Sequence, residues 1–197
     1  MSAKNPYRLS FSTGGLFAPA SVELASIYED LGDWEAVKKI AGERGLTGFQ
    51  AKSSSTRTIR ELVTRLSFLN DDERSLLLSG SSVEQSALLW LALCRTYPFI
   101  REFSIEVLGE RLAHFRTDLN YEHFDAYVAS KSQWNEDLDD LSETTLKKLR
   151  QILFRYMREA GVLVEGDRIA AYLLPSSVRA LLEQQDPTEL RFFPGVT

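Results

Sequence analysis

The chain has 197 residues, with 23 Lys and Arg against 28 Asp and Glu and a hydrophobic fraction of 44%. This balance is typical of a globular protein and excludes a disordered or collagen-like chain. The single cysteine excludes an internal disulfide and a cysteine zinc site. The two histidines leave little for histidine-based catalysis or metal binding. The longest apolar run, residues 87–94, is far shorter than the ~20 residues that cross a membrane, and no segment has the pattern of a signal peptide. We therefore expect a cytoplasmic protein.

The chain begins with an alternation of apolar and polar side chains over residues 7–12, which predicts a short strand ended by Gly14 and Gly15. Helix-start and helix-stop residues and apolar spacing then predict helices along most of the chain. These helices cover residues 19–31, 34–43, 56–69, 71–78, 82–94, 99–115, 121–131 and 142–160, and a last one begins at Pro175.

A β-hairpin is predicted directly after the helix at 142–160. Residues 162–164 and 168–174 flank the turn residues 165–167, with Gly166 at the centre. The helical pattern is weakest at residues 116–120, which predicts two domains, 1–118 and 119–197. The sequence thus indicates a mainly α fold, with a helical N-terminal domain and a C-terminal winged-helix-like unit that carries a small β-hairpin.

The helix predicted at 142–160 is strongly basic on one side. Residues 144–160 hold five Lys or Arg and one acid. At 100° per residue, Lys147, Lys148, Gln151, Arg155 and Arg158 fall opposite the apolar stripe, and Arg150 lies to the side.

This arrangement is typical of a winged helix-turn-helix, in which the second helix enters a major groove and the hairpin contacts the backbone. Arg168 in the hairpin is suited to a phosphate. The alternative is an ordinary solvated helix face. The absence of acids on the basic arc favours DNA contact, because surface helices normally mix both signs.

A second basic stretch begins at Lys52 and continues into the helix at 56–69. Hydroxyl groups and free N–H groups at a helix start, followed by arginines, favour an anion site. The candidate DNA-binding residues here are Lys52, Ser55, Arg57, Arg60 and Arg65. Glu61 on the same arc weakens this interpretation, and a plain helix cap with solvated arginines is an equal alternative.

No residue pattern favours an enzyme. His123 with Asp118, Glu122 and Asp125 could form a metal site, but acids near a helix start are explained better by the helix dipole. Cys94 lies in an apolar run and is expected to be an inert core thiol. We expect no catalytic residues, no metal and no cofactor.

Several segments together resemble the BrxA family of bacteriophage-exclusion (BREX) systems. The resemblance rests on the sequences at residues 7–17, 31–34, 57–65, 89–92, 99–103, 124–125, 147–150 and 158–161, and on Trp134. It implies a helical, non-enzymatic component of a phage-defence complex, similar in part to the antitermination factor NusB. It also implies binding to double-stranded DNA and other BREX proteins as partners. Such proteins are encoded beside a methyltransferase, an ATPase and a phosphatase-like protein.

Combining the two lines, we expect a protein that binds double-stranded DNA mainly through phosphates, with weak sequence preference. Gln151 is the one candidate for a base-edge contact. Two alternatives stay open: an adaptor whose basic faces dock acidic protein surfaces, and RNA binding in the manner of NusB. The oligomeric state is not predicted.

Overall fold

A computed structural model describes residues 9, 11 and 13–196. The N-terminal half forms five helices: α1 (Ala18–Leu31), α2 (Trp34–Arg44), α3 (Lys52–Leu66), α4 (Asp71–Ser79) and α5 (Ser82–Thr96). The predicted strand at residues 7–12 falls outside the described residues except for Leu9 and Phe11. The Phe11 ring is fully buried and stacks at 6.0 Å from the ring of Phe99.

The next segment was predicted as one helix over 99–115, and the structure has continuous helix over 98–113 with a π-helical stretch in its middle. The structure has α6 (Pro98–Phe103), a π-helix (Ser104–Gly109) and α7 (Glu110–Ala113). Pro98 occupies the first turn of α6, where its missing N–H is tolerated. The chain continues with α8 (Tyr121–Ser132), a short α9 (Glu136–Asp139) that lies in the acidic stretch, and α10 (Glu143–Glu159).

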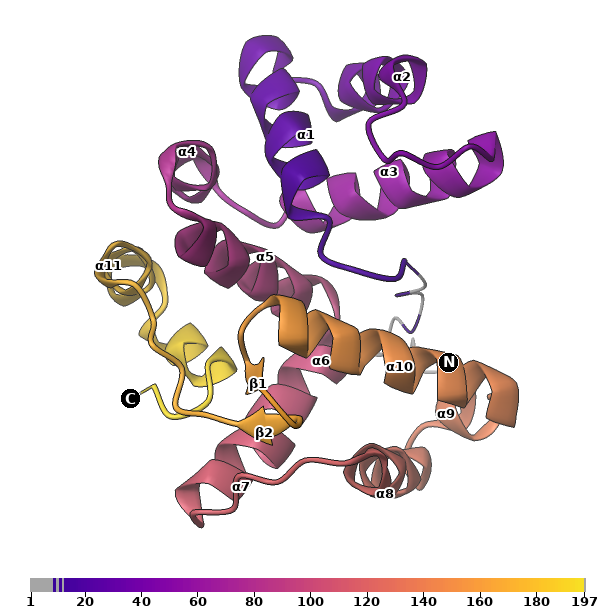
Figure 1. Cartoon of the computed structure of the whole chain (residues 1–197), viewed down its shortest axis with the longest axis vertical. Helices are drawn as coiled ribbons and strands as arrows, with labels where there is room; N and C mark the ends of the chain where they lie inside the picture. The colour runs from indigo at the N-terminus through magenta and orange to yellow at the C-terminus, as the bar shows by residue number, and fades with distance from the viewer. Residues whose placement is uncertain (1–8, 10, 12, 197) are drawn as a thin grey trace, which may run out of the picture.

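The predicted hairpin is present, but its strands are short: β1 (Leu163–Val164) pairs antiparallel with β2 (Arg168–Ile169). Beyond β2, the backbone N–H of Tyr172 donates to the carbonyl of Pro194, near the end of the chain. Helix α11 (Ser176–Gln185) and a 3₁₀ helix, η2 (Pro187–Phe192), complete the fold. The mainly α architecture with a small hairpin is confirmed (Figure 1).

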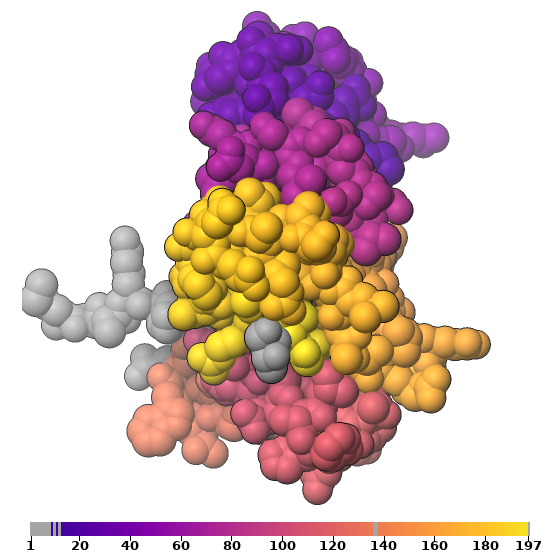
Figure 2. Space-filling view, turned by 90° about the vertical axis from the view of Figure 1, so that its left-hand side faces the viewer, coloured from indigo at the N-terminus to yellow at the C-terminus, as the bar shows by residue number. Residues whose placement is uncertain are grey.

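Helix α5 lies at the centre of the core. Every residue from Ala87 to Cys94 is buried, and α5 contacts α1, α3, α4, α6, α10, α11 and η2. The C-terminal elements therefore pack back onto the N-terminal helices. In Figure 2 the C-terminal segment covers the middle of one face, between the N-terminal helices and the region of α7.

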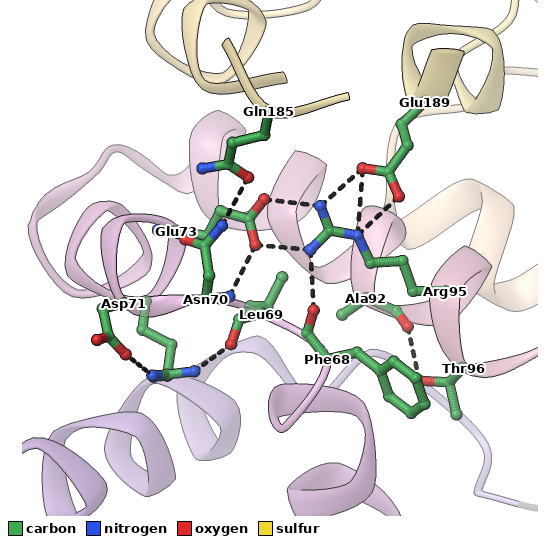
Figure 3. Close-up of polar contacts among 11 residues, drawn as sticks. Phe68, Leu69, Asn70, Asp71, Glu73, Ala92, Arg95, Thr96, Gln185 and Glu189 are labelled. Atoms are coloured by element: carbon green, nitrogen blue, oxygen red, sulfur yellow. Dashed lines mark hydrogen bonds and ion pairs between the residues drawn. The ribbon is translucent and has the colours of Figure 1, made fainter. Parts of the chain in front are cut away.

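A charged cluster fastens this C-terminal segment. Arg95 of α5 donates to both oxygens of Glu73 in α4, at 2.6 and 2.8 Å, and to Glu189 in η2 at 2.6 Å. Figure 3 shows the Arg95 guanidinium between the two carboxylates. The cluster joins α4, α5 and η2. The Glu73 side chain is fully buried, so its carboxylate is shielded from water. The predicted division at residue 118 stays a prediction, and the contacts of α5 with α10 and α11 cross it.

Candidate nucleic-acid interface

Helix α10 forms as the sequence predicts. The Ser142 hydroxyl caps it by accepting from the N–H of Thr145, and Gly161 follows its end with a φ of 74°. The predicted apolar stripe is buried. Phe154 is also fully buried, although it lies beside the stripe, because its ring packs edge-on against Tyr121 of α8 at 4.8 Å. More of the helix circumference is therefore enclosed than the periodicity indicates.

The predicted basic arc faces solvent. The exposed residues are Lys147, Lys148, Gln151, Arg155 and Arg158. Arg150 is an exception and its assignment to a DNA surface is corrected: its side chain is 17% exposed and is ion-paired with Asp125. The guanidinium also lies 4.4 Å from the ring centre of Tyr121. Arg150 therefore ties α10 to α8.

The expectation that this arc lacks neighbouring acids is wrong. Glu143 pairs with Lys147 at 2.6 Å, and Glu159 pairs with Arg155 at 2.7 Å, each one helical turn away. Both acids stand four residues from their partner, the spacing that brings helical side chains together. Within the described part of the chain, Lys148 and Gln151 make no polar contact.

The hairpin lies against the end of α10. Asp167 in its turn has a φ of 54° and accepts two hydrogen bonds from Arg158, at 2.5 and 2.6 Å. Arg168 is exposed, and its Nε donates only to the nearby carbonyl of Glu165. On the other side of β2, residue 118 forms an antiparallel bridge with Arg168, and Ile169 donates to the carbonyl of Thr117 at 2.7 Å. The hairpin is thus held on both sides.

In α3 the predicted basic residues divide into two groups. Lys52, Arg57 and Arg60 are exposed and make no ion pair with any residue that the structure describes. Ser55 is buried and accepts from the hydroxyl of Thr47 at 2.9 Å, so its placement on an anion surface is corrected. Arg65 is 2% exposed and is corrected in the same way. The acid that seemed to weaken this surface, Glu61, faces inward as well.

Arg65 lies at the centre of a buried polar cluster. Its guanidinium donates to Glu61 at 3.0 Å, to the hydroxyl of Thr13 at 2.6 Å and to the carbonyl of Gly15 at 3.1 Å. It also donates to the hydroxyl of Tyr156 in α10. Burial and the charge of Glu61 raise the pKa of Tyr97, whose hydroxyl donates to that carboxylate. These partners satisfy a charge that would otherwise be costly to bury.

The segment at residues 13–16 joins the two basic helices. Figure 1 shows it running between α3 and α10. The N–H of Leu16 donates to Glu159 at 2.6 Å, and a Cβ on Gly15 would lie 3.0 Å from that carboxylate. A side chain at residue 15 would therefore make the Glu159 carboxylate shift by a few tenths of an ångström. The two glycines signalled a turn, and nothing in the sequence indicated that the turn touches Glu159.

The histidine considered for a metal has a different role. The ring nitrogen Nδ1 of His123 accepts from the N–H of Asn120 at 3.1 Å, while the Asn120 side chain caps the N–H of His123. Cys94 is fully buried, and burial raises the pKa of its thiol well above the usual value. Among the residues that the structure describes, no helix is long and apolar enough to span a membrane.

Comparison with known proteins identifies the family. A family model named BrxA matches residues 5–186, which is nearly the whole chain. This chain belongs to the BrxA family. The resemblance drawn from the sequence segments is thereby confirmed.

Two individual proteins are similar to this BrxA-family chain. The BREX protein BrxA of Escherichia coli O9:H4 (strain HS) is 29% identical over 144 residues, which cover 70% of this chain and 68% of that protein. The crystal structure of an uncharacterized protein from Magnetospirillum magneticum superposes with a TM-score of 0.80 at 16% identity, covering 98% of this chain and all of the other. That match establishes a shared fold.

Proposed function

We propose that this protein is a non-enzymatic component of a BREX anti-phage defence system and that it binds double-stranded DNA. The family membership and the relative named as a BREX protein support the first part. The observation that carries the second part is the exposed face of α10, where Lys147, Lys148 and Arg155 project from a helix whose opposite side is core.

The order of elements around α10 supports a winged helix-turn-helix. Helix α8, the short helix α9, helix α10 and the hairpin follow one another, and the backbone at residues 117–118 adds to the free side of β2. In such a unit the second helix lies in the major groove and the hairpin contacts the backbone. We therefore expect the face of α10 and Arg168 to contact the same duplex.

The ion pairs on α10 are weak enough for DNA phosphates to displace them. Side chains in the pairs of Lys147 and Arg155 are 32–82% exposed, and exposed pairs contribute only about 0–1 kcal/mol. A phosphate can therefore replace Glu143 or Glu159 as the partner. Lys148 has no carboxylate to exchange, so we assign it the strongest phosphate contact.

Sequence preference is expected to be weak. The groups on the face are mainly cations, which bind phosphates without reading bases. Gln151 is exposed between them and can pair with an adenine edge. Lys52, Arg57 and Arg60 on α3 form a second cationic surface that can bind further phosphates.

A second candidate function is an adaptor whose basic faces dock acidic surfaces of partner proteins. The pairs with Glu143 and Glu159 favour it, because in them cations of α10 donate to carboxylates, as they would on an acidic partner. If the protein is an adaptor, its binding to a partner protein should not depend on duplex DNA.

The test compares two triple variants that change the net charge equally. Each phosphate contact contributes about −0.9 to the slope of log K against log salt on B-DNA. Lys147→Ala/Lys148→Ala/Arg155→Ala should weaken binding equally for unrelated duplexes and flatten the slope by about two to three units. The control Lys38→Ala/Lys39→Ala/Arg44→Ala on α2 should leave both nearly unchanged.

Two outcomes would contradict the proposal. Equal affinity and salt slope for the folded α10 variant and the wild type would favour the adaptor. Turnover of DNA or nucleotide that disappears on mutation of His123 or Asp125 would show an enzyme. A third variant, Arg57→Ala/Arg60→Ala, measures how much α3 contributes to DNA affinity. We expect a smaller loss of affinity than for the α10 variant.

A further inference from the structure

An open cavity in the described part of the molecule lies away from the centre of the basic face. It has a volume of about 780 Å³ and lies between α8, α9 and the start of α10. Its apolar lining comes from Phe124, Val128, Leu138, Leu141 and Leu146. The volume is in the range of sites that bind ligands, and the lining is of the type that takes apolar groups.

The surroundings of this cavity are acidic. Residues 132–146 contain five Asp or Glu and no Lys or Arg. Asp139 lines the cavity and, with the neighbouring Asp140, is exposed without an ion pair to any described residue. The two cations in the lining are already paired, Lys147 with Glu143 and Arg150 with Asp125. The carboxylates of Asp139 and Asp140 therefore attract cations to this rim of the cavity.

Two further features are typical of a protein-binding surface. Trp134 is 88% exposed and follows Gln133, which lines the cavity. Tryptophan is enriched among the residues that dominate binding energy in protein interfaces. The Nε–H of Arg150 is buried and has no acceptor among the described residues. Buried donors are normally paired, so a carbonyl oxygen from a bound chain would complete this site.

We propose that this cavity docks an amphipathic segment of a partner protein, whose apolar side chains enter the pocket while flanking Lys or Arg side chains face Asp139 and Asp140. The apolar lining favours the apolar side chains of the segment, and the acidic rim favours its Lys or Arg side chains. The two ends of α10 then have different partners, a basic segment at its start and a polyanion along its exposed face. The inference does not rest on DNA binding.

The probe for this site is a fluorescein-labelled helical peptide with Leu at i, i+3, i+4 and i+7 and Lys between them. Two matched peptides replace Lys by Glu or Leu by Ser. Fluorescence anisotropy with the full chain should detect the Leu/Lys peptide and little of the other two. Binding should weaken as salt is added, because exposed charges are screened.

Variants locate the binding. Ala129 is exposed on α8 and lines the cavity, so Ala129→Phe places a ring in part of it without removing core atoms. We expect about tenfold weaker peptide binding, the effect of losing one dominant contact. Ala126→Phe, on the same helix but outside the lining, should bind as the wild type does.

The charge of the rim is tested in the same way. Asp139→Lys should weaken the Leu/Lys peptide by roughly three- to tenfold at low salt and by less at high salt. Asp30→Lys, an equal change at an exposed acid of α1, should have little effect.

Peptide binding that is equal in Ala129→Phe and the wild type, or equal for the Lys and Glu peptides, would overturn the proposal. Duplex DNA affinity, measured on the same variants, is expected to be unchanged by Ala129→Phe. A protein that binds the peptide at this cavity but binds no DNA would support the docking site and reject the DNA-binding function, so the two failures are distinguishable.

Discussion

Arg158 of α10 binds both carboxylate oxygens of Asp167 in the hairpin turn, with Nε and Nη2 as the donors. The guanidinium also lies 5.9 Å from the ring centre of the buried Phe154. This contact fixes the hairpin relative to the helix that we assign to DNA. It also makes Arg158 less available to a phosphate than Lys148.

The pair gives the hairpin a defined pH dependence. Hydrogen bonds from Arg158 lower the pKa of Asp167 below its usual 3.8. A lowered folded-state pKa contributes stability above the usual value and loses it as the pH falls through the folded value. The free energy of unfolding of Asp167→Asn should therefore be lower than that of the wild type by about 0.5–1 kcal/mol at neutral pH.

Urea unfolding across pH checks this prediction. The difference should be constant above about pH 5 and shrink below about pH 4. Asn suits the positive φ at this position, so the variant removes the charge without adding strain. Glu165→Gln changes an exposed acid in the same turn and should cost less than ~0.5 kcal/mol. A difference that does not change with pH would contradict the ion pair.

The Arg95 cluster should dominate the stability of the C-terminal segment. Removing one member of a buried pair leaves an uncompensated charge and costs about 3–5 kcal/mol. Arg95→Ala should reach this range because the Glu73 side chain is fully buried. Chemical denaturation is the measurement, and Lys38→Ala, which breaks an exposed pair with Glu35, is the control. Equal losses for the two variants would show that the cluster is not a determinant of stability.

The Arg65 cluster should hold the segment at residues 13–16 against α10. Arg65→Met leaves the buried Glu61 with the Tyr97 hydroxyl but without its ion-pair partner, so we expect a loss of about 3–5 kcal/mol. Hydrogen exchange distinguishes a local effect from a global one. The Leu16 amide, which donates to Glu159, should lose more protection than the amides of α4. Unchanged protection of Leu16 in a folded variant would contradict this role.

Comparing alanine substitutions at two glycines with positive φ distinguishes backbone strain from steric clash. A Cβ on Gly195 would lie 2.8 Å from Leu112 and 3.1 Å from the backbone of Ala171, whereas Gly48 has open space. Left-handed backbone costs roughly 1–2 kcal/mol for alanine at either position, and overpacking adds about 1–3. Gly195→Ala should therefore lower the melting temperature clearly more than Gly48→Ala. Equal shifts in calorimetry would show that the tail adjusts freely.

The regular parts of the fold could be predicted because local signals decide them. Ser142 and Gly161 bound α10, and its apolar stripe is buried as the spacing requires. The errors arise where the burial of a side chain depends on partners that are distant in the sequence. Arg65 is buried only because Thr13, Gly15 and Tyr156 supply acceptors, and each belongs to another segment. No pattern within α3 contains that information.

The candidate site shows the same limit. The exposed cations of α10 follow from helical periodicity, so they were predicted. Their acidic partners were missed for two reasons: Glu143 and Glu159 stand at the ends of the helix, and Asp167 comes from the hairpin. The cavity between α8 and α10 has no sequence signature, because five apolar residues from separate elements form it.

The bond between Arg65 and Tyr156 also constrains how a newly made chain can fold. The two residues are 91 positions apart. At a synthesis rate of about 5–20 residues per second, Tyr156 is made roughly 5 to 18 s after Arg65. During that interval the Arg65 guanidinium lacks this acceptor, whereas α1, α2 and α5, against which α3 packs, have already been made or follow soon after it. The N-terminal helices can therefore pack first, and the Arg65 cluster is completed only when translation is nearly finished.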